Sequence, residues 1–174
     1  RINLVGKASL NDVWRRHVLD SAQLMDHLPR PAGRLVDLGS GAGFPGLVLA
    51  ILGAQDVHLI ESDARKCAFL AEVNRATGAG ATIHTARLEN LDSLAADIVV
   101  GRALAPLDTL IGQALHHLAP GGRCLFHKGR NVEQELTESS KNWKMRVSRI
   151  RSISDPSGTI LDLEDIRHRH RPRS

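Results

Sequence analysis

The sequence predicts a three-layer α/β domain in which a mostly parallel sheet of seven strands ends in an antiparallel hairpin. Three observations support this fold class. A short apolar segment, 34–38, runs into a glycine-rich turn and then into a second apolar segment, 46–52. Strand-like apolar runs alternate with segments of helical periodicity as far as about residue 140. Residues 144–166 instead contain two strand-like runs around a turn, which is typical of a hairpin.

The elements follow one another in a regular order. After a cap signal at Asn11-Asp12, apolar side chains, Trp14 among them, recur at helical spacing to Leu28, and Pro29 follows. We expect this helix to pack on the sheet or over a ligand cleft. The turn Pro120–Gly122 introduces the fifth strand. Strands are predicted at 34–38, 56–61, 81–85, 96–101 and 123–127, helices at 46–52, after Asp63 to 77, after Pro106 to 117 and at 132–140, and the hairpin at 144–152 and 159–163.

One domain accounts for the whole chain of 174 residues, which is 42% hydrophobic and 24% charged and therefore able to form a single core. We divide it into an N-terminal helical segment at 1–30, a core at 34–167 and a basic tail at 168–174. Because the chain opens at Arg1 without a methionine, we expect the N-terminal segment to be truncated.

Composition narrows the class of protein. There is no run of eighteen apolar residues, so we expect no membrane span, and the two cysteines fall in helix and strand interiors, which favours the reducing cytoplasm. We favour a monomer. The net charge is +4, and 141–174 holds nine basic against four acidic residues, which suits either a phosphate backbone or a solvated tail. No metal site is expected, since His168 and His170 lie among arginines.

The glycine-rich turn is of the kind that brings backbone N–H groups and a helix N-terminus close to a ligand. Two interpretations fit it. The spacing Gly41-x-Gly43-x-x-Gly46 matches the dinucleotide fingerprint, with Glu61 twenty residues after Gly41 as the ribose-binding acid. The spacing Asp37-x-Gly39-x-Gly41-x-Gly43 matches the first motif of class I S-adenosylmethionine methyltransferases. We favour the second interpretation because Asp37 suits a cationic ligand and would repel a pyrophosphate.

Further candidates lie at the same edge of the predicted sheet. Glu61 ends the second strand, where a carboxylate accepts hydrogen bonds from ribose hydroxyls. Leu88 and Glu89 follow the third strand and are placed to enclose an adenine through backbone groups and an apolar side chain. Phe44, inside the glycine turn, either presses on the ligand or fills the core.

Arg102 is the most informative charge, because it follows the fourth strand beside the expected methyl group. A cation there needs an anionic partner, and a substrate phosphate, a guanine edge or a cofactor carboxylate would each serve. A surface pair with Asp97 or Asp108 is the alternative. The segment after this strand lacks the Asp/Asn-Pro-Pro-aromatic motif of exocyclic-amine methylation, and no cysteine is placed there for attack on a pyrimidine.

Seven segments together carry a resemblance to a known family, and they are Arg1–Leu4, Arg16–Ser21, Val36–Gly46, Glu61–Lys66, Arg87–Glu89, Gly101–Leu107 and His127–Gly129. In order and spacing they resemble the RsmG family, the small-subunit ribosomal RNA guanine-N7 methyltransferases once called glucose-inhibited division protein B. The family's first helices are missing upstream of this chain, and the basic tail is not a family feature that we can place.

The resemblance implies that S-adenosylmethionine binds near Gly39, Phe44, Leu88–Glu89 and Arg102, with S-adenosylhomocysteine as the product. It also implies that the partner is the small ribosomal subunit and that the target is a guanine in the 530 loop of 16S ribosomal RNA. Guanine N7 carries a lone pair and no proton, so transfer needs alignment rather than a general base. We expect Arg102 to be the catalytic residue, orienting the base or its phosphate.

Other basic residues are candidates for RNA contacts. Lys128 and the pair Arg65-Lys66 are expected to contact phosphates, and Arg16 and His17 of the N-terminal helix are further candidates. For His17, together with Asp20 one turn later, we favour fastening of the helix over a role in the cleft. The alternatives are a nicotinamide-binding oxidoreductase, a non-enzymatic RNA-binding protein, and a methyltransferase that acts on a small molecule or a protein.

Overall fold

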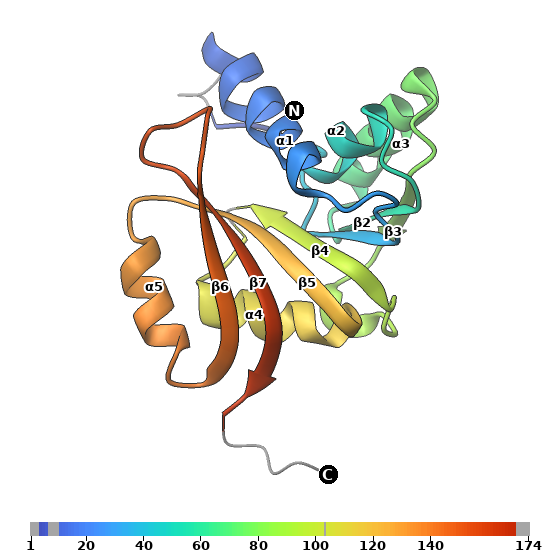
Figure 1. Cartoon of the computed structure of the whole chain (residues 1–174). Coiled ribbons are helices and arrows are strands. Elements are labelled where there is room, and N and C mark those ends of the chain that lie inside the picture. Colours follow the sequence, from blue (N-terminus) through green and yellow to red (C-terminus); the bar gives the residue numbers. More distant parts are fainter. Residues whose placement is uncertain (1–3, 7–10, 103, 170–174) are drawn as a thin grey trace.

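The computed structural model describes residues 4–6, 11–102 and 104–169 (Figure 1). Most of the predicted basic tail, including His170, and the first three residues of the Arg1–Leu4 segment lie outside the described residues. Within the described part, no helix has the length and apolar character that crossing a membrane requires.

Seven strands form one sheet in the order β3-β2-β1-β4-β5-β7-β6. The pairs among β1 to β5 are all parallel, whereas β7 is antiparallel to both β5 and β6. The predicted fold class and the closing hairpin are therefore confirmed. The strands are β1 (Leu35–Leu38), β2 (Val57–Glu61), β3 (Thr82–Thr85), β4 (Ala96–Arg102), β5 (Leu118–Lys128), β6 (Trp143–Arg151) and β7 (Thr159–His168).

Helices cover both faces of the sheet and give the three layers that were predicted (Figure 1). On one face the apolar core joins the strands to the N-terminal helical segment, α2 and α3 through residues such as Leu24, Leu49 and Leu70. On the other face, Leu110 of α4 and Leu136 of α5 pack on the sheet. The helices are η2 (Trp14–Leu19), α1 (Asp20–Ala22), η3 (Gln23–His27), α2 (Gly46–Ile51), α3 (Ala64–Thr77), η4 (Leu88–Asn90), α4 (Leu107–His117) and α5 (Val132–Ser139).

Helix α3 shows how local sequence sets these boundaries. The Asp63 side chain accepts hydrogen bonds from the backbone N–H groups of Arg65 and Lys66, which would otherwise lack partners at a helix start. At the other end, Gly78 adopts the left-handed conformation, with φ +65°, that ends many helices. The predicted bounds of this helix, after Asp63 to 77, are confirmed.

Two predictions about local structure are wrong. Trp14 does not share the buried face of the N-terminal helix, since it is 79% exposed. The segment Trp14–Leu19 winds as a π-helix, so the α-helical spacing on which this prediction rested does not apply there. Pro120–Gly122 is not a turn before β5 but lies within it, where the register against β4 shifts and Gly121 has φ +79°.

Candidate active site

The glycine turn between β1 and α2 uses its glycines in two different ways. Gly39, Gly41 and Gly43 all have positive φ, a conformation that L side chains rarely adopt. A Cβ on Gly39 would lie 2.5 Å from Leu104 Cδ1, and one on Gly43 would lie 2.8 Å from Leu47 Cβ. A Cβ on Gly41 would meet nothing nearer than the Gly39 carbonyl oxygen at 3.8 Å. Gly39 and Gly43 therefore allow close packing, whereas Gly41 keeps space open.

Glu61, at the end of β2, holds this turn through hydrogen bonds to its backbone. Its Oε2 accepts a hydrogen bond from Gly41 N at 2.9 Å, and its Oε1 accepts one from Asp63 N at 2.8 Å. The Lys66 Nζ lies 3.9 Å from Oε2. The side chain is nearly buried, so one carboxylate sets both the glycine turn and the start of α3.

A cavity of about 400 Å³ opens above the carboxyl ends of β1, β2 and β4. Sheets of this kind bind ligands at that edge, where the strand order reverses between β1 and β4. The predicted site residues that line the cavity are Gly39, Gly41, Glu61, Lys66, Leu88, Glu89 and Arg102. Seven candidates from separate parts of the sequence are thus brought together.

Asp37 does not lie in this cavity, which corrects the expectation of a direct contact with a cationic ligand. It is fully buried beneath the turn, where its Oδ2 accepts a hydrogen bond from Gly46 N at 2.9 Å. Burial raises the pKa of its carboxyl to about 7, and the hydrogen bond from Gly46 offsets this only in part. Asp37 joins β1 to the start of α2, and the charge argument from sequence does not apply to it.

Arg102 ends β4, and the N-terminal helical segment holds its guanidinium. Nη1 donates to the Arg16 carbonyl oxygen at 2.9 Å and to Asp20 Oδ2 at 3.3 Å, and Nη2 donates to His17 Nδ1 at 2.8 Å. The guanidinium carbon lies 5.2 Å from the ring centroid of Phe44. Surface pairs with Asp97 or Asp108 are not formed, since Asp97 accepts from Arg34 N and Asp108 from Asn142.

Phe44 and His17 form a small stack beside this arginine. Their ring centroids lie 5.1 Å apart with an angle of 26° between the planes. Phe44 is half-buried, belongs to neither apolar core cluster and is not among the residues that line the cavity. Burial and the charge of Arg102 lower the pKa of His17, which keeps its ring neutral and able to accept at Nδ1.

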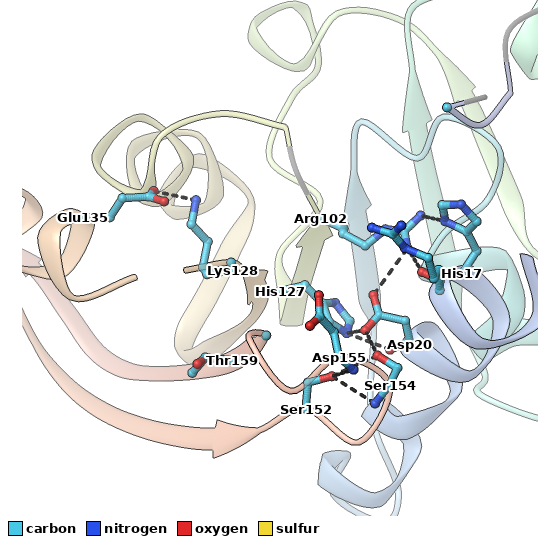
Figure 2. A pocket seen from close by; sticks show the side chains of 14 residues that line it. His17, Asp20, Arg102, His127, Lys128, Glu135, Ser152, Ser154, Asp155 and Thr159 are labelled. Atoms are coloured by element: carbon cyan, nitrogen blue, oxygen red, sulfur yellow. Dashed lines mark hydrogen bonds and ion pairs between the residues drawn. The ribbon is translucent and has the colours of Figure 1, made fainter. Parts of the chain in front are cut away.

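A second pocket, of about 600 Å³, also has Arg102 among its lining residues (Figure 2). Arg102 lines both spaces. The walls of the second pocket come from the N-terminal helical segment, the ends of β4 and β5, α5 and the loop between β6 and β7. Predicted RNA contacts that line it are Arg16, His17 and Lys128.

Several residues that line this pocket were not singled out from sequence. His127 Nε2 donates to the Asp20 carbonyl oxygen at 2.7 Å, and burial lowers the pKa of the His127 ring. Ser154 Oγ donates to Asp20 Oδ1, and Ser152 Oγ lies 2.9 Å from Ser154 Oγ. His127 opens the family-like segment His127–Gly129, and Ser152 and Ser154 precede the predicted hairpin turn, but neither pattern indicated these contacts.

Comparison with known proteins identifies the family of this chain. The model of the GidB family, described as rRNA small subunit methyltransferase G, matches residues 1–160. The chain belongs to this family. It is 57% identical over 166 residues to the ribosomal RNA small subunit methyltransferase G of Paramagnetospirillum magneticum, a match that covers 95% of this chain and 81% of that protein.

Solved structures with low sequence identity to this chain share its fold. A putative S-adenosylmethionine-dependent methyltransferase from Methanococcus maripaludis matches with a TM-score of 0.65 and 13% identity, over 90% of each chain. A putative transferase from Pyrococcus horikoshii matches with a TM-score of 0.68 and 17% identity, over 83% of this chain and 61% of that one. The sheet is therefore that of the class I S-adenosylmethionine methyltransferases.

Two of the basic residues that were predicted to contact phosphates are already paired. Lys128 Nζ lies 2.6 Å from Glu135 Oε2 and donates to the Ala105 carbonyl oxygen, with only 7% of its side chain exposed. This ammonium holds α5 against β5, and a phosphate contact does not follow from its position. Arg65 is exposed on α3 and pairs with Asp63, outside both cavities.

Proposed function

We propose that this GidB-family chain transfers a methyl group from S-adenosylmethionine to N7 of a guanine in the 530 loop of 16S ribosomal RNA. The observation that carries the proposal is the position of Arg102, which borders both the cavity of about 400 Å³ and the pocket of about 600 Å³. A cofactor in the first space and a base in the second would meet beside one guanidinium. The family match supports the ribosomal substrate and disfavours both an oxidoreductase and a small-molecule or protein methyltransferase.

The first cavity fits the cofactor in size and chemistry. Its volume lies within the range of about 300–1,000 Å³ that is usual for small-ligand sites. Gly41 keeps its floor open, and Leu88 and Leu104 add apolar walls on which an adenine can pack. Each oxygen of Glu61 accepts one backbone N–H and has a second acceptor site for a ribose hydroxyl. The cofactor would supply an electrophilic methyl group on a sulfonium.

The acceptor atom determines what the protein must do. Guanine N7 has no proton to remove, so the protein needs to align the base rather than deprotonate it. The two histidines nearest Arg102 agree with this, because His17 Nδ1 accepts from the arginine and His127 Nε2 donates to the Asp20 carbonyl oxygen. We propose that Arg102 donates to O6 of the guanine or to an adjacent phosphate.

Contacts with the RNA backbone would come from exposed basic residues around the two openings. Arg16 is exposed and lines the second pocket, and Lys66 lines the first cavity. Arg65, one residue before Lys66, has 70% of its side chain exposed. We propose that these three residues contact phosphates, and that Lys128 acts only through its pair with Glu135.

The full-length protein, methyl-labelled S-adenosylmethionine and small ribosomal subunits that lack this modification give the direct test. Digestion and nucleoside analysis should place the label in 7-methylguanosine from the 530 loop. Tight binding of S-adenosylhomocysteine without label in the RNA would retain the cofactor and reject the target. Binding of NADH in place of S-adenosylhomocysteine would reject the cofactor as well.

A further inference from the structure

We propose that Asp20 is a positioning residue that fixes Arg102 between the two spaces of the site. Asp20 itself would not contact the methyl group or the base. The expected role of Asp20 in methyl transfer rests on the proposed function. Its role in holding the Arg102 guanidinium beside the first cavity does not. From the sequence, Asp20 was expected only to fasten the N-terminal helix.

The contacts of Asp20 join three separate parts of the chain (Figure 2). Its Oδ2 lies 3.3 Å from Arg102 Nη1, and its Oδ1 accepts from Gln23 Nε2 at 3.0 Å and from Ser154 Oγ. Its carbonyl oxygen accepts from His127 Nε2. One residue of the helical segment therefore contacts the ends of β4 and β5 and the loop between β6 and β7.

Charge explains why Arg102 depends on this carboxylate. The side chains of Arg102 and Asp20 are 17% and 15% exposed, so solvent screens their attraction less than it would at an open surface. The other hydrogen bonds of the guanidinium, to the Arg16 carbonyl oxygen and His17 Nδ1, go to neutral acceptors. Within the described residues, Asp20 is the carboxylate that forms an ion pair with Arg102. Without this carboxylate, the guanidinium keeps only its two neutral acceptors and is held less firmly between the two spaces.

The loop between β6 and β7 in turn holds Asp20. Ser154 is buried and bonds to the carboxylate, and Ser152 Oγ contacts both Ser154 and Gln23 Nε2. Gln23 Oε1 accepts from Ile153 N at 2.9 Å, which closes this network. The loop borders the second pocket, so its position is transmitted through Asp20 to the arginine that also lines the first cavity.

A double-mutant cycle separates positioning from a merely structural role. The variants are Asp20→Asn, Arg102→Ala and the double variant, each measured for S-adenosylhomocysteine binding by calorimetry and for single-turnover methylation of small subunits. Asp20→Asn keeps the size of the side chain and removes its charge. A misplaced reacting group costs up to about 10²-fold in rate, so we expect Asp20→Asn to lower turnover roughly 10- to 100-fold and to weaken S-adenosylhomocysteine at least about threefold.

Both effects should disappear in the Arg102→Ala background, because the residue through which Asp20 acts is then absent. Asp26→Asn, an exposed acid on the same helical segment, is the charge-matched control and should leave both measurements within about twofold of wild type. Ser154→Ala removes a hydrogen-bond donor to the same carboxylate. It should lower turnover and S-adenosylhomocysteine affinity by less than Asp20→Asn does, and it should have no further effect in the Arg102→Ala background. It keeps the question answerable if Asp20→Asn folds poorly.

Effects of Asp20→Asn that add in full to those of Arg102→Ala would overturn the proposal, as would wild-type values in both measurements. The binding cycle requires no RNA. If the wild-type protein methylates no 530-loop guanine, the proposed function fails, and the coupling of Asp20 to Arg102 is still decided by the dissociation constants for S-adenosylhomocysteine.

Discussion

Gly46 donates its backbone N–H to Oδ2 of Asp37 over 2.9 Å, which ties the first turn of α2 to the middle of the sheet. A Cβ on Gly46 would lie 2.6 Å from Asp37 Cβ, so only glycine permits this approach. The other carboxylate oxygen, Oδ1, has no hydrogen-bond partner within the described residues. Asp37 is thus a buried acid whose Oδ2 accepts from a single backbone donor. Keeping its carboxylate ionised in this buried position costs free energy.

Asp37 should make the free energy of unfolding depend on pH. Burial raises the pKa of this carboxyl in the folded protein to about 7, whereas the unfolded chain loses the proton near 4. Between these values the folded state binds more protons, so stability falls as pH rises from about 4 to 7 and is constant above. Asp37→Asn removes this dependence. The difference in the free energy of unfolding between Asp37→Asn and wild type should therefore increase by up to about 4 kcal/mol, in favour of the variant, as pH rises from 4 to 8.

Urea unfolding of both proteins across this pH range measures the difference, in which the other titrating groups cancel. Asp37→Ala is the companion variant. It also removes the acceptor for the Gly46 N–H and should lose about 1–3 kcal/mol relative to Asp37→Asn at every pH. Parallel pH curves for wild type and Asp37→Asn would show that this carboxyl is not perturbed.

Glu61→Gln tests whether the carboxylate under the glycine turn matters for cofactor affinity. The carboxylate accepts from Gly41 N and Asp63 N on different oxygens, but an amide offers one oxygen and turns its NH₂ group toward the second donor. We expect S-adenosylhomocysteine to bind about 10- to 100-fold more weakly. Glu72→Gln, an exposed acid on α3, is the matched control for calorimetry. Equal affinities for the two variants would count against this role.

Gly41→Ala and Gly43→Ala should fail in different ways. Both residues have positive φ, which costs an alanine about 1–2 kcal/mol. A Cβ on Gly43 would also lie 2.8 Å from Leu47 Cβ, so overpacking should add about 1–3 kcal/mol to its loss of stability. A Cβ on Gly41 faces the cavity, so this variant should lose mainly affinity for S-adenosylhomocysteine. Thermal unfolding and calorimetry on both variants distinguish the two outcomes, and identical profiles would contradict the assignment.

The fold was predictable from sequence because its signals are local. Asp63 and Gly78 mark the ends of α3 through contacts within a few residues, and a buried run such as Leu35–Leu38 reads directly as a strand. Trp14 shows the limit of such reasoning. The prediction used the regular α-helical period, and nothing in the local sequence signals the π-helical winding from Trp14 to Leu19.

The position of the site could be predicted from the sequence, but the hydrogen bonds and ion pairs within it could not. Edge residues such as Glu61 and Arg102 follow strands, and the carboxyl ends of parallel strands meet at one edge. The hydrogen-bond partners of Arg102 lie more than eighty residues away in the sequence, and the nearest of them, Asp20, is separated by 82 residues. Sequence could not show that Glu135 already neutralises Lys128, or that Asp37 lies below the cavity rather than in it.

Arg102→Ala is expected to lower the rate of methylation about 10²- to 10³-fold while the fold stays intact. Preorganised donors beside a reacting centre are commonly worth about 10²–10³-fold in rate, and this guanidinium is the group shared by the two spaces of the site. The fold should persist, because the apolar core on each face of the sheet does not include Arg102. The loss of its ion pair with Asp20 should cost about 1–3 kcal/mol, since the carboxylate keeps Gln23 and Ser154 as partners.

Arg102→Lys separates charge from geometry in the same experiment. An ammonium keeps the positive charge but cannot donate at once to Asp20, His17 and the carbonyl oxygen of Arg16 as the guanidinium does. We expect a partial recovery, about tenfold above Arg102→Ala and well below wild type. Methyl transfer to small subunits measures the rate, and circular dichroism with thermal unfolding checks the fold. Full activity in Arg102→Ala would remove Arg102 from the mechanism, and full activity in Arg102→Lys would show that charge alone suffices.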